Sequence, residues 1–219
     1  IDEALDGKWH YQIIVVDDSS PDGTGDAVRG LAEKDDRISL IERPGKLGLG
    51  SAVVTGFDYS DGDYLVMMDA DMSHPVEELP QMLSELASAD VVVGSRYIQG
   101  FPKMGADKDW GLHRRLISFL GNLSIRLVAG LTVRDVTSGF KGFRADVLRS
   151  LDMNQFRCKG FGFQAEMAFI CQSKEYRIVE HHFIFANRLY GTSKMGLGII
   201  VEAVWRLMTM RIRSMVQPI

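Results

Sequence analysis

The sequence contains few cysteines and no long apolar run. Its 219 residues include two cysteines, Cys158 and Cys171, which form no CxxC pair, and no secretory leader is recognisable. We therefore expect no disulfide bond or zinc site, and a reducing, cytosolic environment. No stretch reaches the roughly 18 apolar residues of a membrane-spanning helix, because Arg126, Glu202 and Arg206 interrupt the two most apolar segments. We expect a chain that touches a membrane without crossing it.

The overall composition is that of an ordinary globular protein, with 46% hydrophobic and 25% charged residues. It excludes disordered and collagen-like chains. The net charge of −4 conceals an asymmetry, since residues 1–100 contain 20 acidic and 7 basic residues (−13), whereas 101–219 contain 9 acidic and 18 basic residues (+9). An anionic ligand or surface is the simplest partner for the second region.

Short apolar runs alternate with helical patterns in the first region. The runs lie at 12–16, 38–41, 64–68 and 91–94, and the helical patterns between them at 24–34, 51–59 and 76–87. This alternation predicts right-handed βαβ crossovers and a mostly parallel sheet with helices on both faces. In such a sheet, ligands bind beyond the carboxyl ends of the strands.

The pattern changes after Arg96. It predicts a loop at 97–110, a helix at 111–131, a strand at 137–143, a helix at 161–171, a strand at 178–185, a polar loop at 187–193 and an amphipathic helix at 198–215. We interpret residues 1–219 as one domain, with a change of role near 96–110 rather than a linker between two domains. The helices at 111–131 and 198–215 are partly core, but their basic and apolar residues also suit an anionic bilayer.

Two aspartates, Asp69 and Asp71, follow the third predicted strand. Carboxylates at positions i and i+2 can approach one divalent cation as the chain leaves the strand, and hard oxygen ligands suit Mg²⁺ or Mn²⁺. The alternative is a solvated turn in which Asp71 caps the next helix. A D-x-D pattern alone does not decide between the two.

A second acidic pair, Asp17 and Asp18, ends the first predicted strand. The residues from Pro21 to Thr24 are typical of a turn with a helix cap at Asp22 or Thr24. Turn chemistry does not explain two adjacent carboxylates at the end of a strand. We interpret them as ligands for ribose hydroxyls or base N–H groups, as in dinucleotide-binding folds.

The glycine-rich segment 45–50 matches neither GxGxxG nor GxxxxGK[ST]. It therefore predicts neither a Rossmann nor a P-loop phosphate site. The backbone at Gly48 and Gly50 can approach a ligand closely, and Lys46 is available to an anion. Tight helix packing explains the same glycines equally well.

Four basic residues, Arg96, Arg114, Arg188 and Lys194, fall in loops or helix starts that we place at the same edge of the sheet. Arginine binds phosphate oxygens in a bidentate manner. For any one of them a solvated surface position is the simpler interpretation. Together with a carboxylate-bound metal, the group indicates that two phosphorylated substrates meet here.

Four of the five histidines have no metal-ligand spacing; they are His74, His113, His181 and His182. The last two fall in a strand pattern and should point to opposite faces of the sheet. We interpret all four as structural or surface residues.

Six segments of the sequence occur in the same order as in a known enzyme family. They are Val15–Thr24, Lys46–Gly50, Met68–Pro75, Gly94–Tyr97, Thr137–Phe140 and Arg188–Lys194. From about Tyr11 to Met210 the chain resembles the dolichol-phosphate mannose synthases, which are inverting glycosyltransferases of family two with the GT-A fold. Six ordered segments are far more specific than any one of them.

The resemblance implies that mannose moves from GDP-mannose to a dolichyl or other polyprenyl phosphate, for glycan or glycoprotein assembly, with Mg²⁺ or Mn²⁺ as cofactor. It implies a GT-A fold: a Rossmann-like α/β arrangement with a mostly parallel sheet, helices on both faces and C-terminal amphipathic helices on the acceptor side. It also implies the cytoplasmic face of a membrane, with peripheral attachment or membrane partner subunits, and no nucleic-acid partner.

The resemblance implies one catalytic domain over residues 1–219, in which 1–96 bind the nucleotide sugar and the metal and 97–219 face the acceptor and the membrane. It also assigns roles by position. On the donor side they fall to Asp17 and Asp18 at the nucleoside, Lys46 in the donor site, and Asp69 and Asp71 with Ser73 at the metal and diphosphate. On the acceptor side they fall to Arg96, Arg114 and Ser118 at the lipid phosphate, while Arg188 and Lys194 close on the donor diphosphate. The residues expected to matter most for catalysis are Asp71, Arg114, Arg188 and Lys194. Whether Ser73 binds the metal directly or through water stays open here.

The chain departs from the family at its start. Family members begin with a strand that ends in a Pro-Thr-Tyr-Asn-Glu-like segment, and residues 1–11 do not resemble it. We therefore expect the first strand to be missing, which would leave neighbouring strands without ladder partners.

Three alternatives remain at this point. A polyprenyl-phosphate glucosyltransferase that uses UDP-glucose is the nearest, and residues 20–24 (SPDGT) favour the mannose group only moderately. A haloacid-dehalogenase-like phosphatase would use Asp69 as nucleophile and Asp71 as acid, but that fold carries its D-x-D on the first strand. A non-catalytic nucleotide-sugar-binding module is favoured only by the missing strand.

Overall fold

The first region alternates strands and helices as predicted. The computed structural model describes residues 1–98, 101–102, 112–158, 160, 162–184 and 197–216. After a short helix, α1 (Asp2–Leu5), the chain forms β1 (Ile13–Asp17), α2 (Thr24–Ala32), β2 (Ile38–Glu42), α3 (Leu49–Tyr59), β3 (Tyr64–Met67), a 3₁₀ turn η1 (Val76–Glu78), α4 (Leu79–Glu85) and β4 (Val91–Ser95). All four predicted apolar runs are therefore strands.

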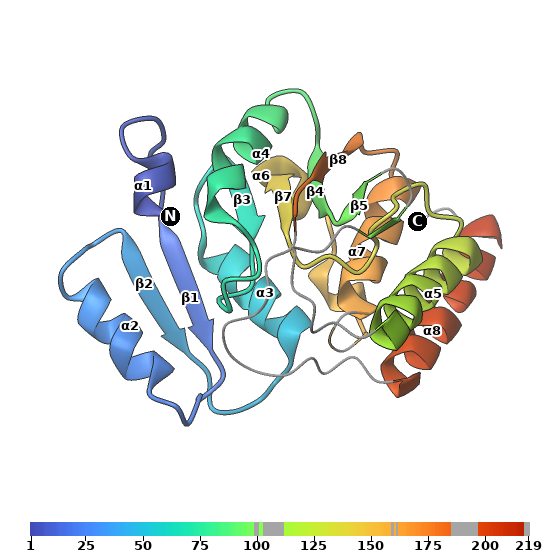
Figure 1. Ribbon diagram of the computed structural model, residues 1–219, viewed down its shortest axis with the longest axis horizontal. Coiled ribbons are helices and arrows are strands. Elements are labelled where there is room, and N and C mark those ends of the chain that lie inside the picture. The colour runs from blue at the N-terminus through green and yellow to red at the C-terminus, as the bar shows by residue number, and fades with distance from the viewer. Residues whose placement is uncertain (99–100, 103–111, 159, 161, 185–196, 217–219) are drawn as a thin grey trace.

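The second region contains the predicted long helices. Its elements are β5 (Tyr97–Ile98), β6 (Phe101–Pro102), α5 (Leu112–Ala129), β7 (Lys141–Arg144), α6 (Ala145–Arg149), η2 (Met153–Gln155), α7 (Gly162–Ser173), β8 (Ile178–His182) and α8 (Leu197–Val216). The predicted loop at 187–193 lies outside the described residues. Helices α5 and α8 pack side by side at one end of the molecule (Figure 1).

The strands form a mostly parallel arrangement in two main hydrogen-bonded parts. Strands β1 and β2 pair in parallel, while a second sheet has the order β3-β7-β4-β8. Strand β7 is antiparallel to both β3 and β4, and β8 is parallel to β4, so β3, β4 and β8 run in one direction. Within the described residues, β1 and β3 each have a partner on one side alone. The expected loss of a first strand remains a prediction.

One strand begins later than predicted. The sequence pattern suggested a strand over 137–143, but the strand begins at Lys141 and the preceding residues form a turn. In this turn the Ser138 hydroxyl accepts the backbone N–H of Phe140 at 3.2 Å. Serine commonly forms such local hydrogen bonds in competition with the strand ladder.

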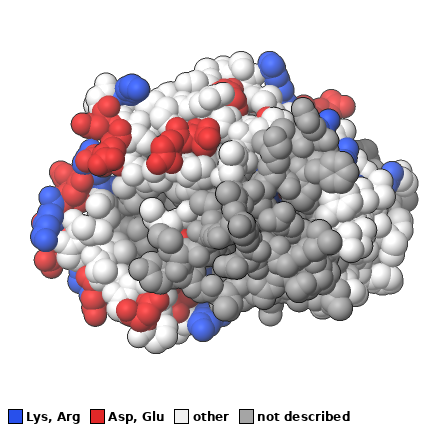
Figure 2. All heavy atoms as spheres, in the orientation of Figure 1, with Lys and Arg blue, Asp and Glu red and all other residues white. Residues whose placement is uncertain are grey.

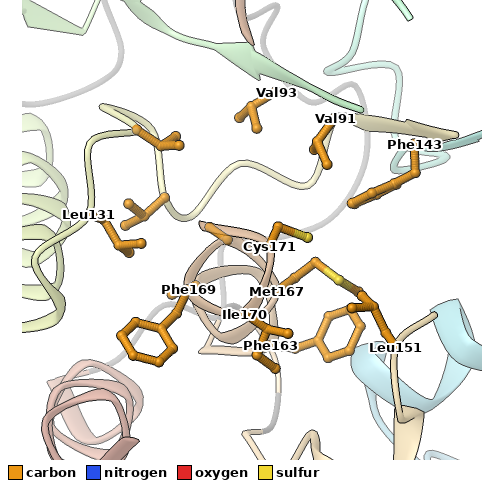
Figure 3. Close-up of a cluster of buried hydrophobic side chains, with 14 of the residues drawn as sticks. Val91, Val93, Leu131, Phe143, Leu151, Phe163, Met167, Phe169, Ile170 and Cys171 are labelled. Carbon is orange, nitrogen blue, oxygen red and sulfur yellow. The ribbon is translucent and has the colours of Figure 1, made fainter. Parts of the chain in front are cut away.

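Two buried clusters cover the two faces of the larger sheet. Alternate residues of one strand separate between them: Leu65 and Met67 belong to the cluster with α7, whereas Tyr64 and Val66 contact the cluster with α4. This is the period of two expected of a strand covered on both faces. Figure 3 shows α7 in the centre of the first cluster, with its side chains directed outwards on several sides. Helix α7 thus covers the face of the sheet to which Leu65 and Met67 belong.

Candidate active site

The acidic segments that the sequence indicated lie at the carboxyl ends of strands β1 and β3. Strand β1 ends in Asp17, β3 leads into Asp69, and β4 leads into Arg96. Two residues in the loops that follow have left-handed backbone angles although they are not glycine: Ser19 with φ 55° and Met72 with φ 64°. Such conformations are costly and concentrate at functional sites. The strand ends are therefore the candidate active site.

The segment from Asp69 to His74 forms a tight, internally bonded loop. The backbone N–H of Asp69 donates to Nδ1 of His74 at 3.0 Å. Asp71 Oδ1 accepts the backbone N–H of Ser73 at 3.1 Å and also accepts the Ser73 hydroxyl. Ser73 and His74 are buried, whereas Asp71 is partly exposed. The loop thus fixes the Asp71 carboxylate through Ser73 and the Asp69 backbone through His74.

The chemistry of this loop fits a hard divalent cation. Asp69 and Asp71 supply carboxylate oxygens, and Mg²⁺ usually takes one or two carboxylates together with waters and substrate phosphates. In the part of the chain that the structure describes, no group of three or more His, Cys, Asp or Glu side chains is placed to hold a metal ion. A two-carboxylate site completed by a phosphorylated substrate is consistent with both observations.

Asp17 and Asp18 differ in their surroundings, although the sequence suggested one role for both. Asp17 is buried, and its Oδ2 accepts the backbone N–H of Ser20 at 3.0 Å. Asp18 Oδ1 lies 2.6 Å from Arg43 Nε, and its Oδ2 accepts the N–H groups of Leu47 at 3.1 Å and Gly48 at 3.4 Å. Because a carboxylate has about four acceptor positions, Asp18 is largely occupied within the protein.

Arg43 is a residue of the site that sequence reasoning missed. It is 7% exposed, and besides Asp18 it contacts the Ser51 hydroxyl at 2.9 Å and the Gly48 carbonyl at 3.2 Å. Its own carbonyl accepts the hydroxyl of Ser19 at 2.6 Å. Arg43 therefore joins the end of β1, the glycine-rich loop and the start of α3. The sequence did contain a signal for Arg43: it lies two positions after the second apolar run (38–41), and a charged residue there falls at the strand ends.

The structure bears on one of the two interpretations of the glycine-rich loop that the sequence left open, which is tight packing. At Gly50 the packing explanation is confirmed, because a Cβ atom would lie 2.8 Å from the ring of Phe163 on α7. Gly48 has φ 100°, which other residues rarely adopt, and it precedes α3. Lys46 is exposed at the surface of this loop.

Arg96 is held by a buried partner that the sequence did not reveal. Its Nε and Nη2 each donate to Asp135 at 2.7 Å, and Nη2 also contacts the Thr137 hydroxyl at 3.0 Å. Burial would raise the pKa of Asp135, but the charge and hydrogen bonds of Arg96 lower it below its usual value. The Arg96 guanidinium is thus bound to Asp135 through Nε and Nη2, and its expected contact with an acceptor phosphate stays a prediction.

The other predicted cationic residues fall in less fully described parts of the chain. Arg114 and Ser118 lie one turn apart on α5, which places both positions on one side of the helix. Arg188 and Lys194 lie outside the described residues, so their roles stay predictions.

The histidines whose side chains the structure describes occupy structural or surface positions. His181 is buried and His182 exposed, which confirms that they point to opposite faces of β8. His74 stacks on Phe140, with ring centroids 5.0 Å apart and an interplanar angle of 11°. His74 also binds the Asp69 backbone, a positioning contact that its spacing in the sequence did not indicate.

Comparisons with known proteins identify the family. A family model described as "Glycosyl transferase family 2" matches residues 2–152. The chain is 42% identical over 195 residues to an undecaprenyl-phosphate mannosyltransferase of Micrococcus luteus, covering 88% of this chain and 79% of that protein. It is 37% identical over 218 residues to a polyprenol monophosphomannose synthase of Mycolicibacterium smegmatis, covering 95% and 81%. A dolichol-phosphate mannosyltransferase of Pyrococcus furiosus is 35% identical, covering 95% of this chain and 58% of that protein.

Solved structures support the fold. A glucosyl-3-phosphoglycerate synthase from Mycobacterium tuberculosis, crystallised with Mn²⁺, UDP-glucose and phosphoglyceric acid, aligns with TM-score 0.60 and 18% identity over 90% of this chain and 67% of that chain. The same synthase with Mn²⁺, UDP and glucosyl-3-phosphoglycerate aligns with TM-score 0.54 and 16% identity over 94% and 68%. The chain therefore has the GT-A fold and belongs to glycosyl transferase family 2, within its group of polyprenyl-phosphate mannosyltransferases.

Proposed function

We propose that the protein transfers mannose from GDP-mannose to a polyprenyl phosphate such as dolichyl phosphate, with inversion at the anomeric carbon. The observation that carries this proposal is the 42% identity, over 88% of the chain, to an undecaprenyl-phosphate mannosyltransferase. The acidic loops at the ends of β1 and β3 supply the chemistry that a nucleotide-sugar donor requires.

On the donor side, Asp69 and Asp71 are the residues that would hold Mg²⁺ or Mn²⁺ against the diphosphate. When bound, the cation neutralises charge on the departing nucleoside diphosphate. Ser73 is buried behind Asp71 and donates to it, so we assign it the role of orienting that carboxylate. Asp17 is assigned to the nucleoside, and Asp18 to the shape of the loop that contains Lys46. Arg188 and Lys194 are assigned to the diphosphate by family resemblance.

On the acceptor side, the nucleophile needs little activation. A phosphate monoester has its second pKa near 6 and is mostly a dianion at neutral pH, so no dedicated general base is required. Positioning is then the main task of the protein. We assign this task to Arg114 and Ser118 on α5, supported by the Arg96–Asp135 pair at the end of β4.

The paired helices α5 and α8 suit attachment to a membrane surface. No helix in the described part of the chain combines the length and the hydropathy that crossing a bilayer requires. Seven large apolar residues of these two helices are nevertheless exposed: Leu116, Leu120, Leu127, Val201, Trp205, Ile212 and Met215. The same helices carry Arg126 and Arg213, which suit anionic lipid headgroups. We propose that this face rests on the cytoplasmic side of a membrane, directly or beside membrane partner subunits.

The test of the proposed function has two stages. A thermal-shift panel of GDP-mannose, UDP-glucose and other nucleotides, each with and without Mn²⁺, identifies the donor. Transfer of labelled sugar to a short-chain polyprenyl phosphate then identifies the reaction. We expect stabilisation by GDP-mannose with Mn²⁺ and formation of a mannosylated lipid. Stabilisation by UDP-glucose with transfer of glucose would overturn the donor assignment, and absence of any sugar transfer would overturn the enzymatic one.

A further inference from the structure

A buried lysine begins β7, directly after the turn that lies against Asp69. Lys141 is the first residue of β7, where it is paired with Met67 on one side and Val93 on the other. Met67 is the last residue of β3, two positions before Asp69, and Val93 lies in the middle of β4, three positions before Arg96. The Lys141 side chain is 1% exposed. Burial lowers the pKa of its ammonium to about 7. Such a costly position needs a structural reason.

The Lys141 ammonium connects two other elements. It donates to the backbone carbonyl of Ser138 and, at 3.0 Å, to Oε1 of Gln164 on α7. Gln164 is itself buried, and its amide nitrogen lies 3.8 Å from the sulfur of Met67. The ammonium therefore links helix α7 to the turn that precedes β7.

That turn lies against the carboxylate of Asp69, the first residue of the D-x-D segment. A Cβ atom on Gly139 would lie 3.4 Å from Oδ1 of Asp69 and 3.6 Å from Cε1 of His74. The next residue, Phe140, stacks on His74, and its carbonyl accepts the backbone N–H of Gly94 at 2.8 Å. A displacement of the turn would therefore be transmitted to both Asp69 and His74.

We propose that Lys141 is a positioning residue of the transfer reaction, which fixes the turn from Ser138 to Phe140 and through it the carboxylate of Asp69. The inference rests on the proposed function. Removal of the ammonium leaves the Ser138 carbonyl and Gln164 Oε1 buried without this donor, so the turn relaxes towards other partners. Displacements near 1 Å at a reacting centre can cost about 100-fold in rate.

The test compares two variants of Lys141 with one variant of Phe143, which lies on the same strand. Lys141→Met removes the ammonium, Lys141→Arg keeps a cationic donor, and Phe143→Leu perturbs the same strand in the core without touching the turn. Two properties are measured: Mn²⁺ binding in the presence of GDP, by calorimetry, and kcat and KM for sugar transfer. Lys34→Met, at an exposed position, serves as the surface control.

For Lys141→Met we expect Mn²⁺ binding about tenfold weaker and kcat lower by about 10- to 100-fold, with the acceptor KM changed less than about twofold. Lys141→Arg should recover most of the loss, and Phe143→Leu should lower Tm without changing Mn²⁺ binding. Mn²⁺ binding within twofold of wild type in Lys141→Met, or an equal loss in Phe143→Leu, would overturn the proposal.

A second variant covers the case in which Lys141→Met does not fold. Gln164→Met removes one of the two acceptors of the ammonium, and we expect Mn²⁺ binding about threefold weaker; a wild-type value would count against the inference. The wild-type protein separates the two proposals. If it binds Mn²⁺ with GDP but transfers no sugar, the proposed function fails, while the comparison of Mn²⁺ binding among variants still tests the role of Lys141.

Discussion

The strand-end edge and the α5/α8 end of the molecule are built on opposite principles. At the strand ends, charged groups are buried and paired, as in Asp18 with Arg43 and Asp135 with Arg96. Helices α5 and α8 instead expose seven of the twelve large apolar side chains that are exposed in the described residues. Figure 2 shows acidic atoms gathered over the half that contains β1 and β2, whereas the end near α5 and α8 is largely uncharged.

The two regions therefore suit different tasks: the strand ends suit binding of a polar substrate, and the α5/α8 end suits contact with an apolar surface. A polar substrate must be held in one geometry, and buried, hydrogen-bonded charges define geometry well. An apolar prenyl chain or a bilayer offers no such groups, and contact with it depends on area rather than on direction. The predictions below test this separation by altering one region and measuring both properties.

The largest effect is expected at the strand-end edge. Asp71→Ala should abolish transfer, and Asp71→Asn should lower kcat on the order of 10²–10³-fold, because both remove a carboxylate that we assign to the metal. Vesicle binding should not change. Initial rates over a Mn²⁺ titration measure the effect, with Asp61→Asn, at an exposed position, as control. Near-normal, metal-dependent transfer by Asp71→Ala would contradict the metal assignment.

The next largest effect concerns stability. Asp135→Asn leaves the Arg96 guanidinium without its buried counter-charge, and loss of one partner from such a pair costs about 3–5 kcal/mol. Urea denaturation should show a correspondingly lower free energy of unfolding. The exposed pair of Arg144 and Asp146 is the matched control, and Asp146→Asn should cost at most about 1 kcal/mol. Similar losses in the two variants would show that Asp135 is not a special partner.

At the other end of the molecule, Trp205→Glu should act on membrane binding alone. The Trp205 side chain is 65% exposed, so the folded state loses little, whereas a negative charge is repelled by anionic lipid. We expect flotation with anionic vesicles at low salt to fall at least about tenfold, with unchanged nucleotide binding. Glu33→Gln is the control, because Glu33 is exposed and lies in the acidic first region of the chain (residues 1–100). Unchanged flotation would remove α8 from the membrane surface.

Within the strand-end edge, Asp17 and Asp18 should respond differently. Asp17→Asn should raise the donor KM with little change in Tm, since Asp17 is assigned to the nucleoside. Asp18→Asn should lower the free energy of unfolding by about 1–3 kcal/mol, because Arg43 loses its counter-charge and one of the two acceptor oxygens becomes an NH2 group that faces other donors. Thermal denaturation and donor saturation curves distinguish the two. The same response in both variants would refute the division of roles.

The smallest effect is expected for Ser73→Ala. One hydrogen bond to Asp71 is lost, which corresponds to about 0.5–1.5 kcal/mol or roughly 2- to 13-fold in rate. If Ser73 bound the cation directly, the Mn²⁺ concentration for half-maximal rate would rise much more than kcat falls. Measuring both values therefore decides between an orienting and a ligating serine.

Much of the fold was predictable because it follows from local patterns. The β-branched runs that became β1 and β4, and the helices between them, are visible within windows of about ten residues. The D-x-D segment was found for the same reason. The turn before β7 was mistaken for a strand, because Ser138 uses its hydroxyl in a local hydrogen bond that a pattern of apolar residues does not record.

The pairings within the site were not predictable in this way. Arg43 meets Asp18 from 25 positions away, Arg96 meets Asp135 from 39, and Lys141 meets Gln164 from 23. Periodicity describes which face of an element is buried, and it does not say which charge on another element will be opposite. In each case a buried charge needs a partner, so the sequence could indicate the need but not the identity of the partner.

The division of the strands into two hydrogen-bonded parts has a mechanical consequence. Asp17 belongs to the part formed by β1 and β2, whereas Asp69 follows β3 in the other part, and no ladder hydrogen bond joins β1 to β3 within the described residues. Helix α3 packs against both β1 and α7, so the spacing between these two carboxylates is set by side-chain packing. A donor that contacts both Asp17 and Asp69 would connect the two sheets directly, so donor binding would restrict their relative motion.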